Sequence, residues 1–410
     1  AELFNVRGFQ SCVDPTVHFG LAKANVDSVL IQWPDGSESI IPSPELNKRH
    51  EIAQAETVRR NRVVSDPIEA RFKTVATPGN YTHSENEYDD FVSEILLPHR
   101  QSEHGPAIDV ADVDGNGTDD FIVTAAHGTS PTLFLGNGSG KFNPSSSQPW
   151  NAHRESEFIG AKFLDIDGDS DLDLYLAAGS SEKGETAEEY TDRLYVNNGS
   201  GSFTYSPTAL PVIQKSTQCI VPIDLDADGD LDLFIGGRNV PGSYPASPMS
   251  YVLLNNGQGK FTDNSAAWLD DPHLGIVTAA VAGDVDKDGA LDLGFAGEWT
   301  RMELLKNMGD HLSNEHGLPA PDKDLKGWWY SLALRDLDAD GDLDIVAGNL
   351  GLNNKFHPSK KKPLKVYMGD MDRTGTNDIV LAKTSDHGEL PVRGRECSSE
   401  QMPFIKDQFK

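Results

Sequence analysis

Five aspartates alternate along the stretch Asp224-Leu-Asp-Ala-Asp-Gly-Asp-Leu-Asp232, which runs directly into the apolar residues Leu233-Phe-Ile235. Five further stretches repeat this nine-residue pattern, and each leads into a short apolar run typical of a buried strand. One such match would be weak evidence, but six at regular intervals decide the architecture. The other five loops begin at Asp112, Asp165, Asp284, Asp336 and Asp370.

The pattern predicts a Ca²⁺ site in each loop. Side-chain oxygens at positions 1, 3 and 5, a backbone carbonyl at position 7 and a carboxylate at position 9 make an oxygen-only shell, which is what Ca²⁺ prefers. None of the loops contains His or Cys, so Zn²⁺ is a poor match. The predicted ligands are Asp112, Asp114, Asn116, Thr118 and Asp120; Asp165, Asp167, Asp169, Asp171 and Asp173; Asp224, Asp226, Asp228, Asp230 and Asp232; Asp284, Asp286, Asp288, Ala290 and Asp292; Asp336, Asp338, Asp340, Asp342 and Asp344; and Asp370, Asp372, Thr374, Thr376 and Asp378.

Two details qualify this interpretation. Glycine occupies position 6 in five loops and allows the positive φ of a tight turn, whereas the second loop has Ser170 there and should be somewhat strained. An EF-hand is excluded, because its loop ends in a glutamate at position 12, where this chain never has an acid. The alternative is a set of acidic turns without metal, and it is strongest for the sixth loop, where Thr374 replaces an acid.

Composition narrows the possible partners. The chain has 410 residues and a net charge of −29, and the six loops hold 26 of its 64 acidic residues. Such a chain is a poor partner for nucleic acid, and its one basic run, Lys360–Lys362, is typical of a solvated turn. The spacing of the three cysteines, Cys12, Cys219 and Cys397, matches no recognisable disulfide framework or metal-binding motif. No apolar stretch is long enough to span a bilayer.

The spacing of the loops indicates a repeat of several strands. Their first aspartates are 53, 59, 60, 52 and 34 residues apart, which suits propeller blades rather than the nine-residue repeat of calcium-binding β-helices. The first three units also contain Asn-Gly between apolar runs, at Asn137, Asn198 and Asn256, which is a strong hairpin signal. One unit is therefore predicted as strand, acidic loop, strand and hairpin, a four-stranded blade.

With these motifs, residues 105–410 resemble FG-GAP/VCBS repeats, the blades of integrin-α-type β-propellers. The resemblance implies Ca²⁺ in the loops, up to six ions, with partners engaging other surfaces. It also implies an all-β fold in which seven blades are usual, although six repeats are recognisable. The ring must close by pairing its first and last strands, either with help from the connector or imperfectly.

The N-terminal residues 1–58 resemble part of another module, ASPIC/UnbV, found with such propellers in bacterial surface proteins and in cartilage acidic protein. The resemblance rests on Val17-His-Phe-Gly-Leu21 and on Val26-Asp-Ser-Val-Leu-Ile-Gln-Trp-Pro-Asp-Gly36. The alternation of Val29, Ile31 and Trp33 predicts a half-buried strand ended by a turn. Residues 59–104 are expected to be an extended connector that packs on the propeller.

The sequence contains no catalytic motif. Glu298, Glu185, Glu188 and Glu189 are acids outside the loops that a polysaccharide-active enzyme could use. The aromatic residues Trp328-Trp-Tyr330, with Trp299, predict either packing between blades or a stacking platform for sugar rings.

The leading hypothesis is therefore a non-catalytic, calcium-binding propeller, secreted or at the cell surface, that binds a protein or glycan partner. The alternatives are a polysaccharide-active enzyme with the propeller as scaffold and a structural spacer within a longer surface protein.

Overall fold

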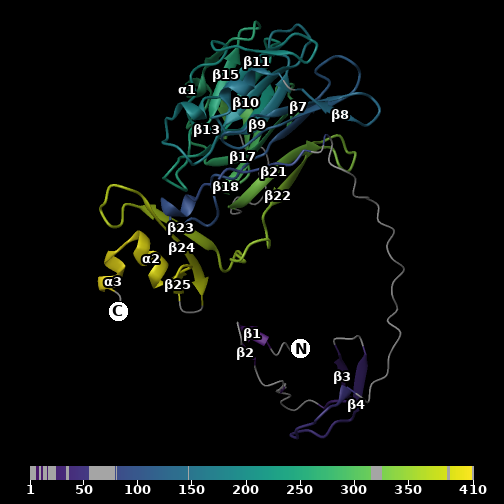
Figure 1. Ribbon diagram of the computed structural model, residues 1–410, viewed down its shortest axis with the longest axis vertical. Helices are drawn as coiled ribbons and strands as arrows, with labels where there is room; N and C mark the ends of the chain where they lie inside the picture. The colour runs from purple at the N-terminus through teal and green to yellow at the C-terminus, as the bar shows by residue number, and fades with distance from the viewer. Residues whose placement is uncertain are drawn as a thin grey trace. The chain divides into compact units, whose positions relative to one another are not determined.

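A computed structural model of the chain describes residues 6–8, 11–12, 16, 25–33, 37–54, 79, 81–145, 147–314, 326–385 and 388–408. The chain divides into two compact units, Ala1–Val75 and Ala76–Lys410. Both units consist of antiparallel sheets (Figure 1). The acidic loops all lie in the second unit.

The first unit contains two short hairpins. Strands β1 (Val6–Gly8) and β2 (Ser11–Cys12) form one, and β3 (Ser28–Gln32) and β4 (Glu38–Pro42) form the other. In β3, Val29 and Ile31 are half-buried while their neighbours are exposed, as the alternation predicts. The Trp33 indole donates to Ser39 Oγ at 2.8 Å and joins the two strands beside the turn. The turn predicted at residues 34–36 lies outside the described residues, as does the stretch 17–21.

The second unit begins with four sheets of one design, in each of which the strands follow one another in chain order. An acidic loop joins the first strand to the second. A hairpin joins the third to the fourth, with Asn-Gly in the first three sheets and a degenerate form of that sequence in the fourth. The strands are β5 (Ile108–Ala111), β6 (Asp120–Val123), β7 (Thr132–Gly136) and β8 (Phe142–Pro144); β9 (Phe158–Leu164), β10 (Asp173–Ala178), β11 (Arg193–Asn197) and β12 (Phe203–Tyr205); β13 (Ser216–Ile223), β14 (Asp232–Asn239), β15 (Tyr251–Asn255) and β16 (Phe261–Asp263); and β17 (Ile276–Gly283), β18 (Asp292–Thr300), β19 (Glu303–Asn307) and β20 (Leu312–Ser313).

The fifth and sixth sheets depart from this design. In the described residues the fifth has two strands, β21 (Gly327–Arg335) and β22 (Asp344–Asn349), and the sixth has three, β23 (Leu364–Gly369), β24 (Asp378–Ser385) and β25 (Gly388–Pro391). The four-stranded blade predicted for every unit is therefore found in the first four. Strand β21 also pairs with β18, through Glu298 opposite Trp328, so the fourth and fifth sheets share an edge.

Short helices lie before, between and after these strands. In the second unit they are η3 (Asp90–Val92), η4 (Pro149–His153), η5 (Glu188–Tyr190), α1 (Ser265–Trp268), α2 (Arg395–Gln401) and α3 (Phe404–Gln408).

The core lies between successive sheets. One cluster of buried side chains joins the first and second sheets, a second joins the second and third, and a third joins the third and fourth. Trp150, which is 1% exposed, belongs to the first of these clusters and donates from its indole to Pro131 O at 2.9 Å. Strands β10 and β14 are buried along their whole length because they lie in sheets that have neighbours on both faces. Burial of this kind contributes about 25 cal/mol per Å² of apolar surface.

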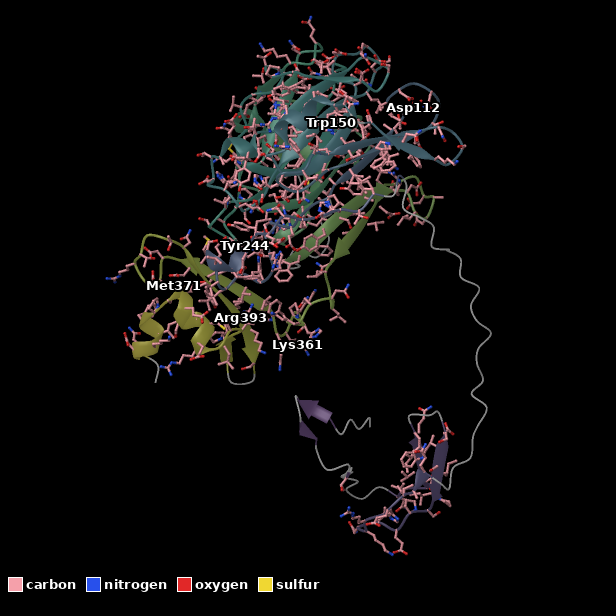
Figure 2. The ribbon with its side chains drawn as sticks, in the orientation of Figure 1. Asp112, Trp150, Tyr244, Lys361, Met371 and Arg393 are labelled. Atoms are coloured by element: carbon pink, nitrogen blue, oxygen red, sulfur yellow. The ribbon has the colours of Figure 1, made fainter. Side chains whose placement is uncertain are left out.

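The connector packs against several sheets at once. Leu96 and Leu97 are buried with Tyr244, which follows β14, and with Ile379 of β24. Tyr244 lies on the side of the sheets that faces β23 and β24 (Figures 1 and 2). Residues 81–104 contribute no strand among the described residues, and η3 is their one regular element. The connector thus links the sixth sheet to the third and fourth sheets.

A repeated asparagine joins each hairpin to the preceding unit. The side-chain amide of Asn255 donates to Ile166 O in the second loop at 2.8 Å and to Leu231 O in its own loop at 3.2 Å. Asn197 reaches Val113 O at 2.8 Å in the same way, and Asn307 reaches Leu225 O at 2.9 Å. These bonds fix the stagger between neighbouring sheets, because they join backbone positions that belong to different units.

We expect Asn255→Ala to lower the free energy of unfolding by about 1–3 kcal/mol, since it leaves two carbonyl groups without their donor. Urea unfolding followed by tryptophan fluorescence measures the change. Thr262→Ala, at an exposed position of the adjacent strand β16, is the control and should stay within about 0.5 kcal/mol of the parent. Equal effects of the two substitutions would contradict this role of the asparagine.

Candidate metal-binding loops and a buried polar network

Each acidic loop turns through two residues of positive φ. At position 6, φ is 83° at Gly117 and 94° at Gly229, and Ser170 adopts 74° in the second loop, as the sequence predicted. Position 4 also has positive φ in all six loops, including 59° at Ala227 and 63° at Lys287. Sequence reasoning missed this second turn residue. Left-handed geometry at a non-glycine residue costs about 1–2 kcal/mol, so other interactions in the loop must offset the strain.

This turn brings the carboxylates together. In each of the first five loops, the acids at positions 1, 3 and 9 can place one oxygen each within 4.8 Å of the others. The residues are Asp112, Asp114 and Asp120; Asp165, Asp167 and Asp173; Asp224, Asp226 and Asp232; Asp284, Asp286 and Asp292; and Asp336, Asp338 and Asp344.

Positions 5 and 7 also take part in the turn. The oxygen at position 5 accepts a hydrogen bond from the N–H at position 7, as between Asp228 and Asp230 at 2.9 Å. Asn116 and Thr118 make the same bond at 2.8 Å in the first loop. In the sixth loop, Thr374 Oγ1 lies 2.7 Å from Asp372 Oδ1, so the threonine hydroxyl replaces the carboxylate inside the turn.

The acid at position 9 anchors its loop, and it is buried in every loop except the fifth. Asp173 is 1% exposed, and it accepts from Ile166 N at 3.2 Å and from Asn197 N at 2.8 Å. Burial raises the pKa of Asp173 to about 7 and that of Asp232 to about 6, because the surroundings disfavour their charged forms. A cation beside them would favour the ionised forms.

Two oxygens in the loops show that the residues fit such a cation. Asp167 Oδ1 and Asp224 Oδ1 are buried and have no hydrogen-bond partner in the described part of the chain. Buried carboxylate oxygens without partners are costly, and a hard divalent ion is the partner that an all-oxygen set would take. Ca²⁺ bound there would supply positive charge for four or five neighbouring acids.

The four aromatic residues singled out from the sequence do not form one platform. Trp299 and Trp328 meet edge to face with ring centroids 5.3 Å apart, and Trp328 is 9% exposed. Tyr330 is 40% exposed and donates to Glu298 Oε1 at 3.1 Å. Trp329 lies on the opposite face of β21, because side chains alternate along a strand, and its ring is beside Gly327.

Glu298 is the centre of a buried polar network. Arg238 Nη2 lies 2.6 Å from Glu298 Oε1, and the Tyr244 hydroxyl donates to Oε2 at 2.9 Å. His99 Nε2 lies 3.2 Å from Oε1. Burial alone would raise the pKa of Glu298, but the Arg238 guanidinium and His99 hold it well below its usual range. An ionised carboxylate with these partners cannot act as a general acid.

The network lies at the far end of the strands from the acidic loops. Arg238 is six residues beyond Asp232 in β14, which is about 20 Å along an extended strand. Sequence reasoning missed Arg238, although a signal was present. Gly236-Gly-Arg238 and Ala296-Gly-Glu298 each place a charged residue after glycine at the same point of the second strand.

The other acids considered for catalysis lie elsewhere. Glu185 forms an ion pair with Lys215 at 2.5 Å, and Glu188 and Glu189 begin helix η5. The Lys360–Lys362 run is an exposed turn, closed by Ser359 N donating to Lys362 O at 3.0 Å.

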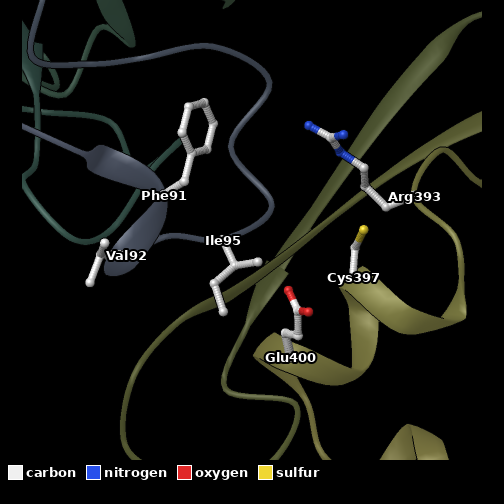
Figure 3. A pocket seen from close by; sticks show the side chains of 6 residues that line it. All are labelled: Phe91, Val92, Ile95, Arg393, Cys397 and Glu400. Atoms are coloured by element: carbon white, nitrogen blue, oxygen red, sulfur yellow. The ribbon is translucent and has the colours of Figure 1, made fainter.

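A cavity of about 560 Å³ lies between η3 and α2, apart from both the loops and the network. Figure 3 shows Arg393, Cys397 and Glu400 on one side of it and Phe91, Val92 and Ile95 on the other.

Cys397 and Cys219 are free thiols, and Cys12 has no described side chain. None of the described helices is long and apolar enough to cross a membrane.

Comparison with protein families identifies both parts of the chain. Residues 1–59 match the family described as ASPIC and UnbV. Residues 112–176, 165–235 and 224–295 each match the FG-GAP-like repeat. The chain therefore carries FG-GAP-like repeats behind an N-terminal ASPIC and UnbV domain. No curated protein matches it.

Three solved structures show limited similarity. An Agrocybe aegerita lectin that recognises non-reducing terminal N-acetylglucosamine is 17% identical, with a TM-score of 0.40 and 60% of each chain covered. The V. cholerae biofilm matrix protein Bap1 is 15% identical, with a TM-score of 0.29, over 58% of this chain and 37% of Bap1. The Photorhabdus luminescens Tc holotoxin pore is 14% identical, with a TM-score of 0.19, over 71% and 15%. The chain thus spans 60% or less of each of these proteins.

We expect Arg238→Met to lower the free energy of unfolding by about 3–5 kcal/mol, because it leaves the Glu298 carboxylate buried and unpaired. The double variant Arg238→Met/Glu298→Gln should recover much of this loss, and thermal and urea unfolding measure both. Arg301→Met breaks an exposed pair with Glu303 and should cost no more than about 1 kcal/mol. A double variant less stable than Arg238→Met would contradict the ion pair's role.

Proposed function

We propose that this chain is an extracellular or cell-surface β-propeller module, stabilised by Ca²⁺, that binds a protein or glycan partner and catalyses nothing. One observation carries the proposal: loop after loop, converging carboxylates are held by the same strained turn at the start of a buried strand. Extracellular calcium is near millimolar, which suits sites with dissociation constants of about 10⁻⁴–10⁻³ M. We retain 1–58, 59–104 and 105–410 as the proposed module, connector and propeller.

We further propose that the six sheets are blades of a ring, and that the complete ring has seven blades. Strand β5 supports this, because Asp109 contacts the second sheet through Phe163 N at 2.6 Å, whereas Ile108 and Val110 point away from it. These two side chains are 61% and 56% exposed, so the first sheet has an apolar face of the kind that another sheet covers in the ring.

The aromatic group near Glu298 is the proposed partner-binding surface. Trp299 and Trp328 pack on each other and support the surface from beneath, and Tyr330 is its exposed member. The hydrogen bond from Tyr330 to buried Glu298 fixes the ring, so that little conformational entropy is lost on binding. The exposed part of a tyrosine ring held in this way can pack on a sugar face or on an apolar part of a peptide.

A non-catalytic role is favoured by how the acids are used. Those in the loops converge on cation sites, and Glu298 is held ionised by Arg238. Glycoside hydrolysis needs one carboxyl that donates a proton beside one that does not, and the Glu298 network supplies only the second kind.

We expect an excess of chelator to lower the melting temperature markedly. A cation that binds only the folded state stabilises it by about 2.7 kcal/mol per site at a hundredfold excess over its dissociation constant. Asp226→Ala should reproduce part of the loss in calcium and respond less to chelator. Asp310→Ala, an exposed acid outside the loops, is the control and should respond like the parent. An unchanged melting curve in excess chelator would refute calcium stabilisation.

The partner is tested on a glycan array in calcium, combined with an assay for new reducing ends. We expect retention on at least one glycan, loss of retention in Tyr330→Ala, and no product. Tyr367→Ala, a similarly exposed tyrosine on β23, is the matched control. Release of reducing ends would support the enzyme alternative. If no glycan retains the protein, the remaining alternatives are a module that binds a protein partner and a structural spacer.

A further inference from the structure

The fourth acidic loop differs from the others in that a lysine lies on its carboxylates. Lys306 Nζ contacts Asp286 Oδ2 at position 3 and lies 2.8 Å from Asp288 Oδ2 at position 5. Among the ion pairs of the described residues, no other loop has a lysine or arginine on its acids at positions 1, 3 or 5. The ammonium therefore occupies the side of the turn where a cation would meet these oxygens.

The fold holds Lys306 beside the loop. The next residue in β19 is Asn307, whose backbone N–H donates to Asp292 Oδ1 at 2.9 Å and whose amide reaches Leu225 O at 2.9 Å. Both bonds belong to the repeated asparagine arrangement, so the backbone of Lys306 has a fixed position. Its side chain is 20% exposed and extends along the fourth loop.

The corresponding residues of the first three units are apolar. Leu135, Val196 and Leu254 each pack against a hydrophobic cluster that includes the next sheet. Leu135, for example, lies against Gly201 in the hairpin of the second unit. The fifth sheet has two strands in the described residues, so no outer hairpin follows on which an apolar side chain at position 306 could pack. A long cationic side chain suits this place because it reaches back to the acids.

A second lysine of the fourth loop points to the neighbouring loop and not to its own acids. Lys287 occupies position 4, with φ of 63°, and its ammonium contacts Asp342 Oδ1 in the fifth loop. Position 7 of the fourth loop is Ala290, where the third loop has Asp230. The fourth loop therefore has fewer acids than the third, and Lys306 alone pairs with two of them.

We propose that Lys306 serves as the internal cation of the fourth loop, so that this loop binds Ca²⁺ roughly tenfold or more weakly than the third loop. Calcium would have to displace an ammonium that already pairs with two of its ligands, and like charges close together repel. The proposal rests on the proposed function, since it describes an exception among calcium-binding loops. The proposal implies that the fourth acidic loop keeps its folded turn when the calcium concentration is low.

The test counts calcium ions on chelator-stripped protein by equilibrium dialysis and native mass spectrometry, with Ca²⁺ itself as the probe. Asp286→Asn disables the fourth loop, Asp226→Asn disables the third by the same change at the same position, and Lys306→Met removes the ammonium. Circular dichroism confirms that each variant is folded.

At a calcium concentration that fills the third loop, we expect Asp226→Asn to lose one bound ion and Asp286→Asn to lose none. Lys306→Met should gain one ion, with affinity for the added site at least about tenfold higher than in the parent. Loss of one ion in Asp286→Asn, or no gain in Lys306→Met, would overturn the proposal while leaving calcium binding by the other loops intact. Absence of calcium from the parent would instead refute the proposed function, and this inference with it.

Discussion

The aspartate at the ninth position of each acidic loop, which is buried in every loop except the fifth, is the residue on which the sheets depend. In all six loops its Oδ2 accepts from the N–H at position 2, at 2.9–3.2 Å. In the first four, its Oδ1 accepts from the third strand at 2.7–2.9 Å. One carboxylate thus joins loop, second strand and third strand. Because a buried charge is costly, the hydrogen bonds to this carboxylate compensate part of the cost of its burial.

Local patterns predicted the parts of the structure that short stretches of sequence determine. The strands that begin at Asp173, Asp232 and Asp344, and the positive φ of Ser170, follow from residue type and spacing. The second turn residue was missed because Ala, Lys and Arg stand at position 4 in four loops, and none of them favours positive φ. There the convergence of the carboxylates determines the backbone, against local preference.

Longer-range features were not predictable in the same way. The pairing of β18 with β21 places Glu298 opposite Trp328, thirty residues later, and nothing near either residue indicates it. The Arg238 to Glu298 pair likewise joins residues 60 apart, and the connector adds His99 from a third part of the chain. The sequence could have predicted which of the aromatic residues share a face, because side chains alternate along β21. This alternation separates Trp329 from Trp328 and Tyr330.

The two ends of the sheets therefore use charge in different ways. At the loop end, carboxylates converge, and in the fourth loop Lys306 lies on two of them. At the other end, Glu298 and Arg238 neutralise each other, and Tyr330, whose hydroxyl is bound to Glu298, exposes part of a ring that is held in place. On the proposed function, calcium would act on the proposed partner-binding surface only through the strands between the two ends. Since β14 and β18 are buried for most of their length, they are rigid elements that would transmit the order of the loops to that surface.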